Sequence, residues 1–452
     1  MTSLVIIVAE DLPIGGLESH ALSMISHFTS RPDYRVTVIT KSGRPGGKAF
    51  AEEIIRETGA DVQGILDGLD YPSSRDRVLA LVKPGSVVFL NSPLPYRLLA
   101  DLRTLARPAA VIIRSGGNDL GLPWSTFVDG SPVSQAYRAL SLRLKGTRLK
   151  ARKVRDKIEA INNHADLLIT NSDFSTRRSI ELGVNPTKIV SITGGVPLEH
   201  FQPREHAPRD ELRILALGRL VRFKGLDYTL KAFAYYRERS DLESRLTIVG
   251  AGPVEGRLKK LAKSLGLAPW VDFKGMVPYA EVPGYYQQSD VFLHLPVLDF
   301  GPGRDGFAHT ETMGRVLCEA SAAGVPIVAA SVGGIPEIIS SEENGFLVEE
   351  KDFVAAGEKL LLLGDARLRK RMGAEGRKAA EALFGWDRVF DRYEELFKRT
   401  KSRQGAMAWA DQGDEEAPAQ VKRSALRTEG RLAAAASKMS WRMWRAVRGS
   451  EW

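Results

Sequence analysis

The chain has 452 residues, too many for one ordinary hydrophobic core, so we expect two or three domains. Its 43% apolar and 26% charged residues are normal for a soluble globular protein, and the single cysteine, Cys318, excludes an intrachain disulfide framework and indicates a reducing compartment. The formal net charge of +9 is unevenly placed, and no apolar run approaches the roughly 20 residues needed to span a bilayer.

Short β-branched runs alternate with helical stretches from the beginning of the chain. The N-terminus lacks the basic flank and the small-residue cleavage site of a signal peptide, so we expect a cytoplasmic protein. The first half contains six predicted strands, at residues 4–9, 35–40, 86–91, 109–114, 166–171 and 188–193. Their continuous apolar character fits buried parallel strands better than half-exposed antiparallel ones.

The second half repeats this pattern, with predicted strands at residues 212–218, 245–250, 271–275, 290–296, 326–331 and 345–349. Between Gly194 and Arg213 the sequence is polar, contains three prolines and has no periodicity, so we place the junction there. The pattern is typical of an α/β protein with two doubly wound, Rossmann-like domains. We expect these domains at residues 1–198 and 199–384.

Two basic blocks indicate an anionic partner, either nucleic acid or a membrane surface. Residues 138–157 carry nine Lys or Arg and one acidic residue, Asp156, interleaved with leucines. After a predicted closing helix at 385–400, residues 401–452 read as a linker and a basic amphipathic tail, in which Trp441 and Trp444 border a basic face. This tail is typical of an interfacial helix on anionic lipid, although a packed or disordered tail stays open.

The strongest local signal begins at His309, in the stretch HTETMGRVLCEASAAGVP. Glu311 and Glu319 lie eight residues apart, which on one helix would separate them by about 12 Å. Gly314 indicates instead that Glu311 lies in a loop and that a helix begins near the glycine. The paired carboxylates of a retaining glycosidase are only about 5–5.5 Å apart, so two separate roles are predicted here. The helix start offers free N–H groups to a diphosphate.

A second signal begins at Leu215, in the stretch LALGRLVRFKGL. A strand ends at Gly218, and the following loop carries Arg219 and Lys224. Two cations between a strand and a helix can clamp phosphate at the carboxyl edge of an α/β sheet. The glycine pair Gly333 and Gly334 follows another strand of the same half.

In this order, Arg219, Lys224 and the Glu311–Glu319 pair resemble the GT-B retaining glycosyltransferases of family 4, also called glycosyltransferase group 1. The resemblance covers about residues 1–398. It implies that Arg219 and Lys224 hold the donor diphosphate and that Glu319 binds the ribose hydroxyls. It also implies that Glu311 and the backbone after it, up to Gly314, contact the transferred sugar.

Two further segments match the family. Gly275, Met276 and Val277 resemble its nucleobase-side loop. Gly15 and Gly16 match the glycine pair that faces the site from the N-terminal domain.

The chain departs from the family at two positions near the reaction centre. Thr312 stands where the family usually has glycine after the first glutamate. Many members carry a histidine in an N-terminal-domain loop, but the corresponding stretch here has none, and we take Arg114, Asn118 and Asp119 as acceptor-side candidates. His294, between two leucines of a predicted strand, is interpreted as a packing residue.

The resemblance implies a retaining hexosyltransferase that uses a UDP- or GDP-linked sugar and a glycan or lipid-linked acceptor, in polysaccharide or glycolipid synthesis. We expect no cofactor and no metal, because no Asp-x-Asp or His-rich ligand set stands beside Arg219 and Lys224. We expect the protein to work at the inner face of a membrane. A nucleic-acid-binding protein is the alternative that the charge alone supports. A sugar-nucleotide epimerase is a second alternative, which the two cations and the glutamate pair argue against.

Overall fold

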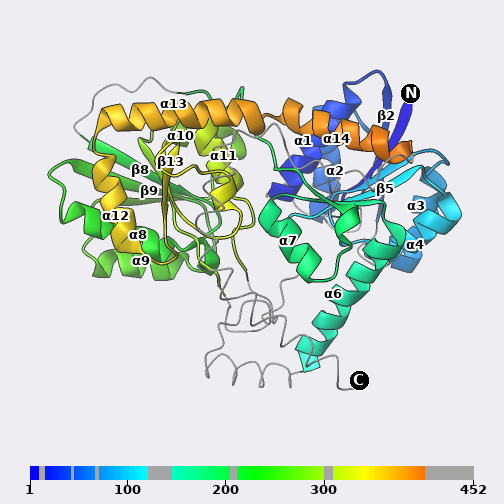
Figure 1. Ribbon diagram of the computed structural model, residues 1–452, viewed down its shortest axis with the longest axis horizontal. Helices are drawn as coiled ribbons and strands as arrows, with labels where there is room; N and C mark the ends of the chain where they lie inside the picture. The colour runs from blue at the N-terminus through cyan, green and yellow to red at the C-terminus, as the bar shows by residue number, and fades with distance from the viewer. Residues whose placement is uncertain are drawn as a thin grey trace.

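The computed structural model describes residues 1–9, 16–41, 45–66, 71–117, 119–120, 145–203, 211–299 and 309–402. Two parallel sheets lie side by side in two α/β lobes (Figure 1). Gly15, Asn118, the start of the first basic block and the whole basic tail from residue 403 lie outside the described residues.

The N-terminal sheet has seven strands in the order β3-β2-β1-β4-β5-β6-β7. Its strands are β1 (Thr2–Ile7), β2 (Tyr34–Lys41), β3 (Asp61–Leu66), β4 (Val87–Leu90), β5 (Ala110–Arg114), β6 (Leu167–Thr170) and β7 (Ile189–Ser191). Leu4 and Ile6 of β1 belong to one buried cluster, and Val5 and Ile7 belong to another. Both faces of this sheet are therefore covered, which explains why its central strands are continuously apolar.

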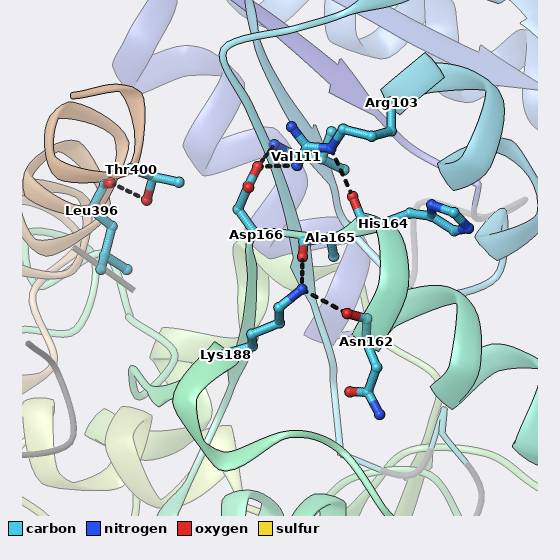
Figure 2. A network of polar contacts seen from close by, with 9 residues as sticks. All are labelled: Arg103, Val111, Asn162, His164, Ala165, Asp166, Lys188, Leu396 and Thr400. Carbon is cyan, nitrogen blue, oxygen red and sulfur yellow. Dashed lines mark hydrogen bonds and ion pairs between the residues drawn. The ribbon is translucent and has the colours of Figure 1, made fainter. Parts of the chain in front are cut away.

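Helices of the N-terminal lobe are α1 (Gly16–Thr29), α2 (Pro45–Thr58), α3 (Tyr71–Leu81), α4 (Leu99–Asp101), α6 (Lys145–His164) and α7 (Asp173–Glu181). Helix α6 projects away from the body of the molecule at its N-terminal end (Figure 1). At its other end a polar network holds it (Figure 2): Lys188 Nζ donates to the carbonyls of Asn162, at 2.6 Å, and Ala165, at 2.9 Å. Arg103 donates to the His164 carbonyl and to Asp166, so cations surround the negative end of the helix dipole.

The C-terminal sheet has six parallel strands in the order β10-β9-β8-β11-β12-β13. They are β8 (Glu211–Leu217), β9 (Glu243–Val249), β10 (Val271–Gly275), β11 (Val291–His294), β12 (Ile327–Ala330) and β13 (Gly345–Val348). Its helices are α8 (Leu226–Arg237), α9 (Glu255–Ser264), α10 (Val282–Gln287), α11 (Arg315–Ala322), α12 (Phe353–Leu362) and α13 (Ala366–Leu383). In both sheets the order reverses beside the first strand, which places a crevice at the carboxyl ends of β1 and β4 and of β8 and β11.

These sheets confirm the predicted fold class of two doubly wound α/β domains. One strand, β3, was missed because Gln63 and Gly64 interrupt its apolar pattern. Since β3 lies at the edge of the sheet, it does not need the continuous apolar run of a central strand. None of the helices in the described part of the chain is long and apolar enough to cross a membrane.

The chain passes between the two lobes a second time at α14 (Trp386–Lys401), which follows α13 along one side of the molecule (Figure 1). The two segments that connect the lobes lie side by side: the Val196 N–H of the first segment donates to the Phe384 carbonyl of the second at 2.8 Å. Five apolar residues of α14 are buried in the core of the N-terminal lobe: Val389, Phe390, Tyr393, Leu396 and Phe397. Helix α14 therefore belongs to the N-terminal core, although it comes after the whole C-terminal sheet.

Candidate active site

Three charged or titratable side chains meet at the carboxyl edge of the C-terminal sheet. Lys224 ends the short helix η5 (Arg222–Lys224) after β8, and His294 is the last residue of β11. Glu311 lies in the loop before α11, and its carboxylate contacts both of these side chains. The Lys224 ammonium donates to Glu311 Oε2, and His294 Nε2 lies 3.1 Å from the same oxygen. The site therefore lies at the point where the strand order reverses.

Burial and charge act against each other at this site. Burial would raise the pKa of Glu311, but the Lys224 charge and the His294 hydrogen bond outweigh it, so the pKa lies well below its usual value. Burial lowers the pKa of His294, which keeps the ring neutral near pH 7. Because a carboxylate can only accept, neutral His294 donates its Nε2–H to Glu311. Glu311 is therefore an ionised carboxylate held by two donors.

Two glycines after β12 cradle the loop that carries Glu311. A Cβ on Gly333 would lie 1.7 Å from the Glu311 carbonyl oxygen, and one on Gly334 would lie 2.2 Å from the Thr312 carbonyl oxygen. The Gly334 N–H also donates to the Glu311 carbonyl at 3.2 Å. Only glycines allow this approach, so the Gly333–Gly334 turn fixes the backbone on which Glu311 stands.

Helix α11 begins directly after this loop, and its N-cap residue is Gly314, whose φ of +86° is in the left-handed region. Among the described residues, no side chain caps this helix start. Its first N–H groups and the positive end of its dipole are therefore suited to an anion.

Glu319, on the same helix, is buried with only 1% of its surface exposed. Its carboxylate accepts from the hydroxyls of Tyr279, at 3.2 Å, and Tyr286, at 3.1 Å, and Arg315 Nε lies 3.4 Å away. Burial raises the pKa of Glu319, while Arg315 and the tyrosine hydroxyls act in the opposite direction. Sequence reasoning missed all three partners. Only the fold brings Tyr279 and Tyr286 beside α11, whereas Arg315 lies four residues before Glu319 on the same helix and could have been found from that spacing.

The segment predicted to lie near the nucleobase, Gly275 to Val277, leads into the Tyr279 loop. Gly275 ends β10 with a φ of +71°, Met276 is 64% exposed, and Val277 is half-buried. Tyr279, two residues further on, connects this segment to Glu319. Arg219, by contrast, is exposed, and we find no partner for its side chain among the described residues.

Residues of the N-terminal lobe approach from the ends of β5 and β6. Arg114 ends β5 and is buried, and Asp119 holds the turn after it by accepting from Ser115 Oγ and from the Gly116 N–H. Lys157 of α6 donates to the Asp119 carbonyl at 2.6 Å, so this member of the basic block supports the loop. Gly16 begins α1, and nothing is described for Gly15 or Asn118.

The structure thus brings Lys224, Glu311 and the start of α11 together and places Glu319 further along the same helix. It also adds His294, which the sequence analysis interpreted as packing. The available signal was its position as the last residue of a central strand, where ligand-binding residues of α/β sheets lie. Among the described residues, no three His, Cys, Asp or Glu side chains gather as a metal ion would require.

Residues 199–379 match the family model described as glycosyl transferases group 1. Over 403 residues the chain is 29% identical to a GDP-mannose-dependent alpha-(1-6)-phosphatidylinositol monomannoside mannosyltransferase of Mycobacterium tuberculosis, covering 85% of this chain and 95% of that protein. A D-inositol 3-phosphate glycosyltransferase of Thermomonospora curvata is 31% identical over 274 residues, which is 55% of this chain and 61% of the relative.

Solved structures share the two-lobed fold. The HepE protein of Anabaena in complex with UDP aligns with a TM-score of 0.65 at 18% identity, over 88% of this chain and all of that one. Sucrose-phosphate synthase of Thermosynechococcus elongatus aligns with a TM-score of 0.67 at 20% identity, over 89% of this chain and all of that one. The C-terminal lobe therefore matches the group 1 glycosyl transferases, the two lobes together have the GT-B fold, and the chain is a nucleotide-sugar-dependent hexosyltransferase.

Proposed function

We propose that the C-terminal domain binds a nucleoside diphosphate sugar and that the hexose moves, with retained anomeric configuration, to a glycan or lipid-linked acceptor on the N-terminal domain. The observation that carries this proposal is the meeting of Lys224 and Glu311 beside the open start of α11 at the edge of the second sheet. A cation, a fixed carboxylate and a helix N-terminus are what a sugar diphosphate requires.

The diphosphate is assigned to Lys224, Arg219 and the first N–H groups of α11. An ammonium has three N–H donors, and Glu311 uses one of those on Lys224, so two can reach phosphate oxygens. Exposed Arg219 lies on the same loop and supplies a second cation. Charge builds up on the departing diphosphate during transfer, so these donors stabilise the transition state more than the bound donor.

The sugar is assigned to Glu311 and the ribose to Glu319. Lys224 and His294 both bind Oε2 of Glu311, and its Oε1 has no protein partner among the described residues. This oxygen is therefore the one that can accept from a sugar hydroxyl. Glu319, held by two tyrosine hydroxyls, can accept from ribose hydroxyls when the Tyr279 loop moves.

GDP-mannose is the first donor to test, because the relative from M. tuberculosis is named for it, and UDP-glucose is the second, because HepE binds UDP. Nucleotide release should be measured with both donors, with wild type, Lys224→Ala and a control variant, Lys260→Ala. Lys260 is exposed on α9. We expect release by wild type and by the control, and a loss of at least a hundredfold with Lys224→Ala. Donor binding by Lys224→Ala within twofold of wild type would contradict the assignment.

We place the acceptor in a membrane, and helix α6 supports this. Val154, Ile158 and Ile161 pack into the core, whereas Arg152, Lys153 and Arg155 of the same helix are exposed. Each Lys or Arg near an anionic surface contributes about 1 kcal/mol. The acceptor named for the relative, a phosphatidylinositol mannoside, is a lipid.

Vesicle flotation tests this placement. Wild type should float with anionic vesicles and not with neutral ones. Replacing the three exposed cations of α6 by glutamine should reduce flotation, as should deletion of residues 418–452. The same replacement on α9, at Lys259, Lys260 and Lys263, is the matched control, because these lysines are also exposed. Equal flotation of both triple variants would contradict a membrane role for α6.

A further inference from the structure

Thr312, the residue after Glu311, is bound to the N-terminal lobe. Its hydroxyl donates to the Gly116 carbonyl at 3.1 Å and accepts from Asn171 Nδ2 at 3.2 Å. Its own carbonyl accepts from the Ser172 hydroxyl at 2.5 Å. Thr312 is only 6% exposed, so these bonds form away from water. Three hydrogen bonds between the lobes thus converge on the residue next to the site carboxylate.

The N-terminal side of this contact is shaped to receive Thr312. Gly117 has a φ of +102°, and a Cβ there would lie 2.4 Å from Thr312 Oγ1. Asn171 also donates to the Gly116 carbonyl at 3.0 Å, so the ends of β5 and β6 present one joined surface. A side chain at residue 117 could not coexist with this contact.

The C-terminal lobe also contacts the peptide between Glu311 and Thr312. The Gly334 N–H donates to the Glu311 carbonyl, and the missing Gly334 side chain leaves room for the Thr312 carbonyl and for Ser172. The backbone between Glu311 and Thr312 is therefore fixed by both lobes at once. A movement of one lobe relative to the other must shift the carboxylate of Glu311 or break these bonds.

A second contact between the lobes lies beside it. Both carboxylate oxygens of Glu337, from the C-terminal lobe, accept backbone N–H bonds at 2.7 Å, from Asp173 and Phe174. These N–H groups open helix α7, where a carboxylate is favourable. We call Thr312, Glu337 and their N-terminal partners the interdomain clasp.

We propose that Thr312 is a positioning residue, which sets Glu311 in its working place only when the two lobes are joined through the clasp. This inference rests on the proposed function, because the position of Glu311 matters only if it faces the transferred sugar. The donor binds to the C-terminal lobe alone in this scheme. Breaking the clasp should therefore slow transfer while leaving donor affinity nearly unchanged.

The test compares Thr312→Val with Thr312→Ser. Valine keeps the volume and removes the hydroxyl, whereas serine keeps the hydroxyl. Loss of the two hydroxyl bonds predicts a kcat that is about tenfold lower for Thr312→Val, with the donor KM within twofold of wild type. Thr312→Ser should recover most of this loss. Equal rates for valine and wild type, or equal losses for valine and serine, would overturn the proposal.

A second readout does not depend on activity. Cys318 is buried, so spin labels can be placed at Leu105→Cys and Lys260→Cys, one exposed position in each lobe. Thr312→Val should broaden the distance distribution between the labels towards longer values, and Gly117→Ala should do the same. Gly85→Ala is the control, because Gly85 has a φ of +82° but nothing within 4 Å of its Cβ position.

These readouts separate the two proposals. If wild type neither binds nor uses any donor, the proposed function is wrong, but the label distances still decide whether the clasp joins the lobes. If wild type transfers sugar and all variants keep its distance distribution, the clasp is wrong and the function stands.

Discussion

The contact between Lys224 and Glu311 allows stability and catalysis to be measured separately. Lys224→Met keeps an unbranched side chain that is only one atom shorter and removes the charge, which leaves the Glu311 carboxylate with His294 alone. The side chains of Lys224 and Glu311 are 15% and 11% exposed, so the pair is largely shielded from water. Removing one partner of a buried pair costs about 3–5 kcal/mol, and because His294 stays, we expect about 3 kcal/mol here.

The double variant Lys224→Met/Glu311→Gln has no unpaired charge. Its neutral amide can still accept from His294, so we expect it to recover roughly 2 kcal/mol of the lost stability. Transfer should not recover, because the diphosphate has lost its cation. The same proteins thus separate the contribution of Lys224 to the fold from its contribution to the reaction.

The measurements are guanidinium unfolding, followed by a probe of the C-terminal lobe because two lobes need not unfold as one unit, and steady-state nucleotide release. A loss below about 0.5 kcal/mol in Lys224→Met would show that the pair is not formed in the folded protein, since exposed pairs contribute that little. Recovery of transfer in the double variant would refute the assignment of Lys224 to the diphosphate.

Three further predictions follow from the site and the clasp. Glu319→Gln should weaken donor binding about 10- to 100-fold in titration calorimetry, because a charged acceptor of the ribose hydroxyls is lost; an unchanged affinity would exclude Glu319 from the ribose. Raising the pH from about 5 to 8 should lower the free energy of unfolding of the protein. Burial, and secondly the Asp173 carboxylate, raise the pKa of Glu337 to about 7, whereas its backbone N–H bonds and Arg177 lower it. Because this pKa is raised in the folded protein, the stabilisation from Glu337 is fully present below its unfolded pKa and is lost as the pH rises through 7. Thermal unfolding of Glu337→Gln should lack this part of the pH dependence, and identical profiles would contradict it. Finally, transfer should continue in excess chelator, because we expect Lys224, Arg219 and α11 to serve the diphosphate without a metal; loss of turnover that magnesium or manganese restores would show the opposite.

Much of the fold could be predicted from the sequence, because buried parallel strands require apolar runs that are visible without a structure. The strands of the C-terminal lobe were all predicted, and Gly314 correctly indicated that a loop ends and a helix begins there. The edge strand β3 could not be found in this way, since an edge strand needs no continuous apolar run.

The site was harder to predict where contacts join distant residues. Asn171 and Thr312 are 141 residues apart, and neither local pattern nor spacing indicates that they meet. Thr312 stood out in the sequence as a departure from the family, but its role depends on Gly116 and Ser172 in the other lobe. His294 had an apolar context that is typical of packing, and only the loop of Glu311 gives its ring a polar partner.

The place of α14 has a consequence for how the protein is made. The strands of the N-terminal sheet leave the ribosome long before residues 386–401, whose aromatic side chains complete the same core. While the C-terminal lobe is being synthesised, an apolar face of the N-terminal lobe stays exposed, and such faces promote aggregation. The second lobe, whose own core is formed by residues from 196 to 384, can fold while the first is still incomplete. The order of folding is therefore expected to run against the order of synthesis, because α14, which is synthesised after the whole C-terminal sheet, completes the core of the N-terminal lobe.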